Sequence, residues 1–533
     1  MSASADSPAR KTPVNVEVPA LVVKHRGWLL VGVMGAMVMQ VLDTTIANVA
    51  LPHMQSSLSA TQDTVTWVLT SYVLASAVAL PLVGWLVSRL GTRTMLLGSV
   101  TLFTLASILC GLAQSLEQMV LFRVLQGLAG AFLGPLAQTV TIDTSTPSER
   151  PKMMALFTQG VMLGPIAGPM LGGYLTENLD WRWVFFVNIP LGIACLVIIA
   201  LCMPRTVGPA RKIDLLGWAL VAGAVSGLQL LLDRGPSQDW FESGEVVSYL
   251  VLSLSCFWMG VVHFAAARNP LFPPAMFTDR NFLGGLLFTF IMGMTMMSVM
   301  ALLPSLLQTI YRYPVIDAGL LLAPRGVGTL LFIMLFSRLM AKSDPRMMLA
   351  CGFGITGFSF WLMTGWSAIM PTWPIVLSGF VQGMGISLVF IPANLITFAT
   401  LPPAYRTDAS GLVNMMRNLG ASIGIAVATF LLGRDIQVNH AELGAEVTRL
   451  SVPFDLDRIT AYGDASAAMI AAADGMINQQ AAMIAYINDF LLMAVVSFVA
   501  IPLILFLKSA KSAMPVTKEA AGSVPDGMAD ALH

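Results

Sequence analysis

Fourteen long apolar segments, joined by short connections that carry charged or turn-forming residues, dominate this sequence. They lie near residues 28–51, 65–88, 94–114, 118–142, 153–176, 183–203, 214–233, 246–267, 281–307, 316–340, 346–366, 373–401, 411–433 and 484–507. A helix crosses the hydrocarbon core of a bilayer with about 20 predominantly apolar residues, so each segment is long enough to span it. The hydrophobicity is continuous rather than alternating, which excludes a membrane β-barrel. We therefore expect an all-α membrane protein with 14 transmembrane helices.

Composition and motif content narrow the function further. Of the 533 residues, 56% are hydrophobic and 11% are charged, whereas a soluble domain carries about 25% charged residues. The formal net charge is zero, which gives no indication of a nucleic-acid partner. The cysteines and histidines show no metal-ligand spacing, and no Gly-rich loop ends in Lys-Ser/Thr. We expect neither an enzyme nor a bound cofactor or metal, so an ion gradient would have to drive any uphill transport.

The distribution of Lys and Arg predicts the orientation. If the N-terminus is cytoplasmic, 20 of the 29 Lys and Arg residues fall in cytoplasmic segments, 6 fall on the opposite side and 3 lie within spans. Cytoplasmic loops of membrane proteins carry this kind of positive excess. We therefore expect both termini in the cytoplasm.

An internal repeat predicts the domain organisation. Gln126-Gly127 followed by Pro135 matches Gln382-Gly383 followed by Pro392, and Ser88-Arg89-Leu90 matches Ser337-Arg338-Leu339 at a similar offset. Duplicated helical bundles around a central site are typical of secondary transporters. We expect an N-terminal six-helix bundle (28–203), two linker helices (204–267) and a C-terminal six-helix bundle (268–507), with cytoplasmic tails at 1–27 and 508–533. A long, partly helical outer connection (434–483) is either a solvated linker or a docking surface.

Ionisable side chains within the spans are the first candidates for function, because each costs at least about 2.5–3.5 kcal/mol to place in the bilayer. Asp43 in the first span and Arg123 in the fourth lie at similar depths, so they are candidate ion-pair partners. Asp43 could bind and release a proton, tuned by burial and by Arg123, or the pair could be a permanent structural lock. Asp489, near the outer start of the last span, is either a second proton site or an interfacial residue.

Other residues in the spans are candidates for the substrate cavity or for gating. Gln126 belongs to this group, and so do Arg325 and Arg417, which have no carboxylate nearby in the sequence. These two arginines could attract anionic groups of a substrate or bond to backbone carbonyl groups.

The fifth span contains glycines and prolines at regular intervals, including Gly164, Pro165, Gly168 and Gly172. Glycines four residues apart lie on one helix face and permit close packing, and prolines permit bending. We interpret this face as a gating pivot packed against the other bundle, and close packing without motion is the alternative.

Several runs of residues together resemble a known family. They are the run from Leu42 to Pro52, Arg123 to Gly127, Gly164 to Gly173, Trp181 to Pro190, and Leu232 to Gly235 followed by Asp239-Trp240-Phe241. Over about residues 28–507 the sequence resembles the fourteen-span drug:proton antiporters of the major facilitator superfamily, most closely the EmrB/QacA group. The resemblance implies an inner-membrane protein that exports hydrophobic or amphipathic molecules in exchange for protons by alternating access, with Asp43 and Arg123 in the coupling or binding region. It also implies a periplasmic adaptor and an outer-membrane channel as partners.

One motif departs from the family pattern. The loop after the second span, with Gly84, Arg89, Gly91 and Arg93 as candidate inner-gate residues, usually has Asp before the first Arg, but here Ser88 precedes Arg89. The usual charge relay at the inner gate is therefore not expected in its full form.

Three other functions remain open. A dedicated exporter of one metabolite, siderophore or fatty acid would show a narrow substrate profile, and a proton-coupled importer would accumulate its substrate in energised cells. A receptor or scaffold that transports nothing would keep full function in an Asp43→Asn variant. Substrate identity has no readable pattern, because apolar cavities bind by shape and adaptable contacts.

Overall fold

The computed structural model describes residues 21, 23–146, 149–205, 212–238, 240–446 and 464–507. These residues form helices and their connections, and no strand occurs among them. The predicted tails, apart from residues 21 and 23–27, lie outside this description, as do residues 447–463 of the predicted outer connection.

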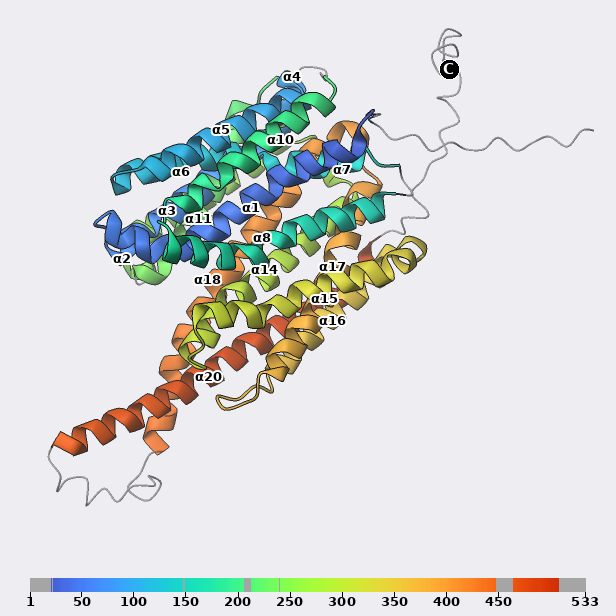
Figure 1. The fold of residues 1–533 in the computed structure, drawn as a ribbon. Coiled ribbons are helices and arrows are strands. Elements are labelled where there is room, and N and C mark those ends of the chain that lie inside the picture. The colour runs from blue at the N-terminus through green and yellow to red at the C-terminus, as the bar shows by residue number, and fades with distance from the viewer. Residues whose placement is uncertain are drawn as a thin grey trace, which may run out of the picture.

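Six long helical units form the N-terminal bundle (Figure 1). They are α1 (Arg26–Ser57), α3 (Trp67–Ala79) continued through the 3-10 turn Leu80–Leu82 into α4 (Val83–Leu90), α5 (Thr92–Leu112), α6 (Leu116–Gly130) followed by α7 (Leu133–Asp143), α8 (Arg150–Asn178), and α9 (Trp183–Phe186) followed by α10 (Asn188–Cys202). A single turn, α2 (Gln62–Val65), precedes α3.

Two linker helices and a second set of six helices follow. The linkers are α11 (Leu215–Arg234) and α12 (Gly244–Ala266), and the C-terminal bundle contains α14 (Arg280–Thr309), α15 (Val315–Lys342), α16 (Pro345–Met363), α17 (Trp373–Ala399), α18 (Arg406–Glu446) and α20 (Asp464–Leu503), after the short α13 (Pro274–Phe277). We call the end of the molecule that holds the start of α1 and the α4–α5, α7–α8 and α10–α11 connections the basic end, and the opposite end the outer end. The predicted class, two six-helix bundles with two extra helices, is confirmed.

Twelve helical segments of the described residues are long and apolar enough to cross a membrane. The other two predicted spans, 153–176 and 316–340, coincide with α8 and α15, which have 29 and 28 residues. At 1.5 Å per residue, helices of that length exceed the roughly 30 Å hydrocarbon core. The structure is compatible with 14 spans, and that count stays a prediction.

The repeated prolines act differently in the two bundles. Pro135 lies in the first turn of α7, just after a turn at residues 131–132 that divides the fourth span. In this position proline removes no helical hydrogen bond. Pro392 lies inside the continuous helix α17, so the duplicated sequences produce different backbones.

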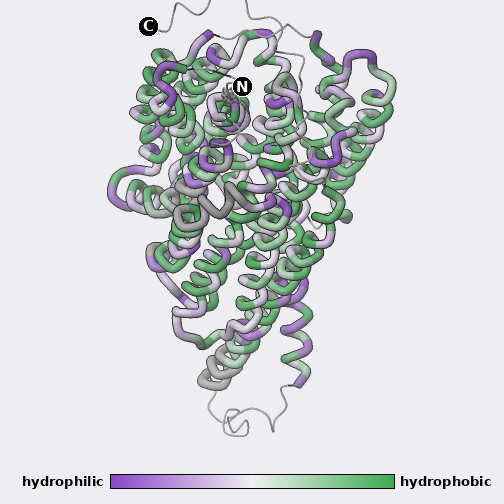
Figure 2. Tube along the Cα trace, turned by 90° about the vertical axis from the view of Figure 1, so that its right-hand side faces the viewer, coloured by the Kyte–Doolittle hydropathy of each residue, from purple (hydrophilic) through white to green (hydrophobic). Residues whose placement is uncertain are grey.

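The predicted outer connection is mostly helix where the structure describes it. α18 has 41 residues and α20 has 40, about twice the length that a span requires. Both helices therefore continue beyond the other helices at the outer end and project as a pair (Figure 1). Figure 2 shows hydrophilic residues on this projecting part, whereas the body of the bundle is mainly hydrophobic.

The glycine face of α8 packs within its own bundle. A Cβ on Gly164 would collide with Val41, one on Gly168 would collide with Thr45, and one on Gly172 would lie 3.2 Å from Val49, and all three neighbours belong to α1. Thr45 also donates a 3.2 Å hydrogen bond to the Gly164 carbonyl. The prediction that this face meets the other bundle is wrong, because α8 reaches the C-terminal bundle through other residues. The periodicity defines the glycine face, but it does not identify the partner helix.

We predict opposite effects for alanine at two glycines of α8. Gly168→Ala should lower stability by about 1–3 kcal/mol, because the added methyl group has no space beside Thr45. Gly173→Ala is the matched control, since nothing lies within 4 Å of its Cβ position, and it should gain up to about 1 kcal/mol of helix propensity. Thermal unfolding in detergent measures both, and equal shifts for the two variants would contradict the packing described.

Candidate functional site

An ion pair lies at the centre of the N-terminal bundle. Nη1 of Arg123 on α6 donates a 2.7 Å hydrogen bond to Oδ2 of Asp43 on α1, and both side chains are completely buried. Arg123 also donates from Nε to the Val68 carbonyl on α3 at 2.9 Å, and its guanidinium carbon lies 4.4 Å from the ring centre of Tyr72. The predicted pairing of Asp43 with Arg123 is therefore present.

Two amides complete the environment of the carboxylate. Oδ1 of Asp43 accepts hydrogen bonds from Gln126 Nε2 at 2.8 Å and from Asn188 Nδ2 at 2.7 Å. Asn188, at the start of α10, also donates to Ser107 on α5 at 2.9 Å, and Gln126 accepts from Arg123 at 2.8 Å. Groups from five helices, α1, α3, α5, α6 and α10, therefore meet in one network around the carboxylate.

The carboxylate of Asp43 lies in a polar environment inside the bundle. Its oxygens accept three hydrogen bonds, and the Arg123 guanidinium lies beside them. Protonation would remove the negative charge and weaken the ties to α6 and α10. A buried charge pair with so many partners is therefore a group whose protonation state can change how helices pack.

Sequence reasoning missed three members of this network: Tyr72, Ser107 and Asn188. Asn188 is an amide within an apolar segment of the sequence, which is a recognisable signal. The sequence contains no such signal for Tyr72 and Ser107, because hydroxyl groups are common in membrane helices and can bond to the backbone of their own helix.

The C-terminal bundle contains buried charges of a different kind. Nε and Nη2 of Arg325 on α15 are buried without a hydrogen-bond partner, and Arg417 on α18 donates at 2.6 Å to the amide oxygen of Asn414. Neither arginine forms an ion pair with a described carboxylate. Asp489 on α20 is 1% exposed, and its Oδ2 has no hydrogen-bond partner. Asp489 lies 25 residues after the start of α20, and its role as a second proton site or an interfacial residue stays a prediction.

Polar side chains join the two bundles towards the basic end. Gln138 on α7 donates to Asn394 on α17 and accepts from Asn414 on α18 at 3.2 Å. The Thr139 and Ser410 hydroxyls lie 3.0 Å apart. These bonds connect α7 of one bundle to α17 and α18 of the other.

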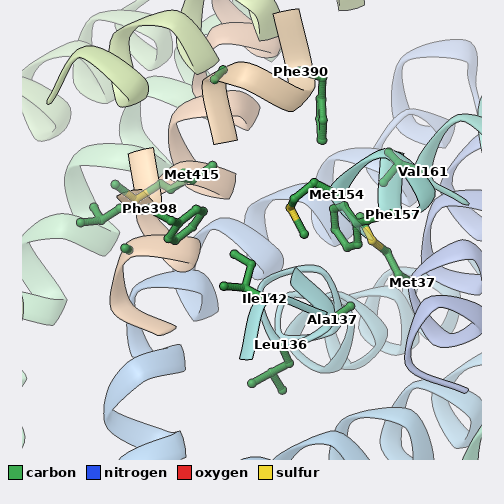
Figure 3. Packing of buried hydrophobic residues seen from close by; sticks show 14 of the residues in the cluster. Met37, Leu136, Ala137, Ile142, Met154, Phe157, Val161, Phe390, Phe398 and Met415 are labelled. Atoms are coloured by element: carbon green, nitrogen blue, oxygen red, sulfur yellow. The ribbon is translucent and has the colours of Figure 1, made fainter. Parts of the chain in front are cut away.

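The same interface contains an ion pair and an apolar layer. Arg406 of α18 donates to Asp143 of α7 at 2.7 Å. Figure 3 shows Ile142 of α7 with Phe398 of α17 on one side of it and Met154 and Phe157 of α8 on the other. The bundles are therefore closed against each other at this end.

The four candidate inner-gate residues have separate environments. A Cβ on Gly84 would collide with Asp408 of α18, so a carboxylate of the C-terminal bundle lies directly on α4. Arg89 lies 5.8 Å from the ring centre of Trp85 on its own helix, and Gly91 adopts φ 81°, a conformation suited to glycine. Arg93 donates at 2.6 Å to the Ala200 carbonyl of α10, so it stabilises the N-terminal bundle.

A second ion pair at the basic end lies wholly within the N-terminal bundle. Arg26 on α1 donates at 2.7 Å to Glu149, which precedes α8. The pKa of the Glu149 carboxyl is lowered because Arg26 and Thr146 donate hydrogen bonds to its ionised form. This pair is partly exposed, so salt and water weaken it.

No group of three or more His, Cys, Asp or Glu side chains that could hold a metal ion occurs in the described part of the chain. As described, the site consists of a buried carboxylate, its donors and the polar interface between the two bundles.

A two-bundle helical membrane protein with buried charges in both halves has the architecture of a secondary transporter. The chain belongs to the Major Facilitator Superfamily, whose model matches residues 33–425. It is a multi-pass membrane protein.

Relatives and solved structures agree with this assignment. The chain is 35% identical to the Escherichia coli multidrug export protein EmrB over 417 residues, which cover 77% of this chain and 80% of the relative. It is 32% identical to the fatty acid resistance protein FarB of Neisseria gonorrhoeae over 92% of this chain and 98% of the relative. The human organic anion transporter MFSD10 shares the fold with a TM-score of 0.56 at 14% identity, covering 89% of this chain and 99% of that one.

We predict that the Asp143–Arg406 pair holds the basic end closed. Arg406→Asp places two carboxylates together and should shift the population towards an open basic end by roughly tenfold, the equivalent of about 1.4 kcal/mol. The double variant Asp143→Arg/Arg406→Asp should restore closure. Spin labels at Leu90 and Met347, both exposed near this end, report the separation by pulsed electron resonance.

Glu149→Gln is the control for this experiment, because it breaks an ion pair inside one bundle. It should leave the distance between the labels unchanged. The claim that this pair holds the basic end closed would be contradicted if Arg406→Asp left the distance between the labels unchanged. It would also be contradicted if the charge-swapped double variant did not restore the wild-type distance.

Proposed function

We propose that this protein is a proton-coupled antiporter that exports hydrophobic or amphipathic small molecules by alternating access, with Asp43 as its proton site. The observation that carries the proposal is the completely buried Asp43 carboxylate, which accepts from Arg123, Gln126 and Asn188. The similarity to EmrB, a multidrug export protein, supports multidrug efflux.

The coupling follows from the hydrogen bonds of Asp43. With the basic end closed, ionised Asp43 holds α1 against α6 and α10. When Asp43 takes up a proton, the attraction to Arg123 falls and α1 is freer to move relative to α6. The polar contacts between the bundles can be exchanged for water at low net cost, so the bundles can rock apart. Substrate binding and proton binding then favour different arrangements of the same helices.

The basic end is assigned to the cytoplasm of an inner-membrane protein, because positive residues gather there. The projecting parts of α18 and α20 then lie in the periplasm. They would offer a surface to a periplasmic adaptor that leads to an outer-membrane channel.

Asp43→Asn should abolish substrate-driven proton movement in proteoliposomes containing a pH-sensitive dye, while substrate binding persists. The reason is that an amide cannot carry the proton. Asp180→Asn, which removes an exposed carboxylate near the end of α8, is the matched control and should transport normally. Full proton coupling by Asp43→Asn would refute the assignment.

The single variant leaves Arg123 buried without its counter-charge, which can cost about 3–5 kcal/mol of stability. The double variant Asp43→Asn/Arg123→Gln removes both charges and retains hydrogen-bonding amides. It should fold and still fail to couple. Proton coupling in a folded double variant would equally refute the proposal.

Export of one class of amphipathic anion, such as a fatty acid, is the second candidate function. It is favoured by Arg325, whose buried Nε and Nη2 lack partners, and by the similarity to FarB, a fatty acid resistance protein. A buried guanidinium without a counter-ion is stabilised when a carboxylate approaches it.

Arg325→Gln should therefore weaken binding of laurate by about ten- to hundredfold, the range for a charge-assisted hydrogen bond, and leave a lipophilic cation unaffected. Arg434→Gln, at an exposed arginine of α18, is the control. Titration calorimetry with both ligands measures these affinities. Equal losses of affinity for laurate and for the cation would show that Arg325 has a structural role instead.

A further inference from the structure

A groove with a basic mouth runs along the surface of α5, away from the Asp43 site. It has a volume of about 490 Å³ and is lined by Arg93, Thr94, Leu97, Gly98, Thr101, Leu102, Leu105 and Arg205. Seven of these eight residues belong to α5, and Arg205 follows the end of α10.

The groove has the shape and polarity of a site for an acyl chain. Its α5 residues recur every three or four positions and so share one helix face. Leu102 is 44% exposed and Leu105 is 53% exposed, on a helix apolar enough to span a membrane. A Cβ on Gly98 would meet nothing within 4 Å, so the glycine leaves a hollow. From Thr94 to Leu105 the helix rises about 17 Å, close to half the thickness of a hydrocarbon core.

The mouth of the groove lies at the basic end and carries two guanidinium groups. Arg93 is fixed by its hydrogen bond to the Ala200 carbonyl, and Arg205 is exposed. Neither forms an ion pair with a carboxylate of the described residues. Within the described residues, the positive charge of these two guanidinium groups is therefore available to an anion.

We propose that this groove binds an anionic phospholipid from the membrane leaflet at the basic end. The phosphate lies between Arg93 and Arg205, and one acyl chain follows Leu97, Gly98 and Leu102 towards Leu105. Basic pockets at the cytoplasmic side of membrane helices are suited to such headgroups. Because Arg93 also bonds α10, a bound lipid would stabilise α5 against the helix that carries Asn188. This inference does not depend on the transport function.

Native mass spectrometry of the full-length protein with added phosphatidylglycerol tests the proposal. The wild type should retain bound phosphatidylglycerol in preference to phosphatidylethanolamine with the same acyl chains. Arg93→Gln/Arg205→Gln should reduce that retention by roughly 25-fold, about fivefold for each arginine. Arg268→Gln removes another exposed arginine at the basic end and should retain the lipid.

A second variant tests the groove without changing charge. Gly98→Leu fills the hollow, and the variant should fold because nothing lies within 4 Å of the added Cβ. It should no longer retain the lipid, and added lipid should no longer raise its unfolding temperature. Gly433→Leu, at another position without neighbours within 4 Å, is the control. Unchanged retention in the groove variants, or equal retention of both lipids by the wild type, would overturn the proposal.

Discussion

The N-terminal bundle is organised around one buried ion pair, because neither Asp43 nor Arg123 can be left alone in a low-dielectric interior. Helices α3, α5 and α10 supply the polar groups that complete the network: the Val68 carbonyl, Ser107 and Asn188. The close packing of α1 on the glycine face of α8 fixes the helix that carries Asp43. In the proposed mechanism, the same ion pair that holds these helices together is the group whose protonation would loosen them.

The two bundles contain different kinds of buried charge. The N-terminal bundle holds a neutral pair, whereas the C-terminal bundle holds Arg325 and Arg417 without described acidic partners and Asp489 without a partner for one oxygen. Between them, polar contacts such as Gln138–Asn414 close the basic end. Such bonds are replaceable by water, while the glycine packing inside the bundle is not. The rocking of the bundles proposed above would break these replaceable polar contacts and leave the packing of α1 on α8 intact.

The sequence predicts the helices better than it predicts which helices and side chains contact each other. Long apolar segments predict the helices, and the rarity of buried charge brings Asp43 and Arg123 together, because each needs a counter-charge. The glycine spacing of α8 predicts a packing face but not α1 as its neighbour, since the partner depends on tertiary arrangement. The predicted spans 411–433 and 484–507 are shorter than α18 and α20 because hydropathy falls where each helix leaves the apolar segment. The connection between them is predicted to be partly helical, and the alanine-rich start of α20 favours helix. Asn188 has no charge, so its role required the structure.

Infrared difference spectroscopy on the purified protein tests the central claim most directly, because it observes the protonation of a carboxyl group without a gradient. Substrate addition should change the carbonyl band of a protonated carboxylic acid, and that change should be absent in Asp43→Asn and retained in Asp180→Asn. The account predicts this loss together with the loss of substrate-induced proton release. A carboxylic acid signal and proton release that persist unchanged in a folded Asp43→Asn protein would contradict it.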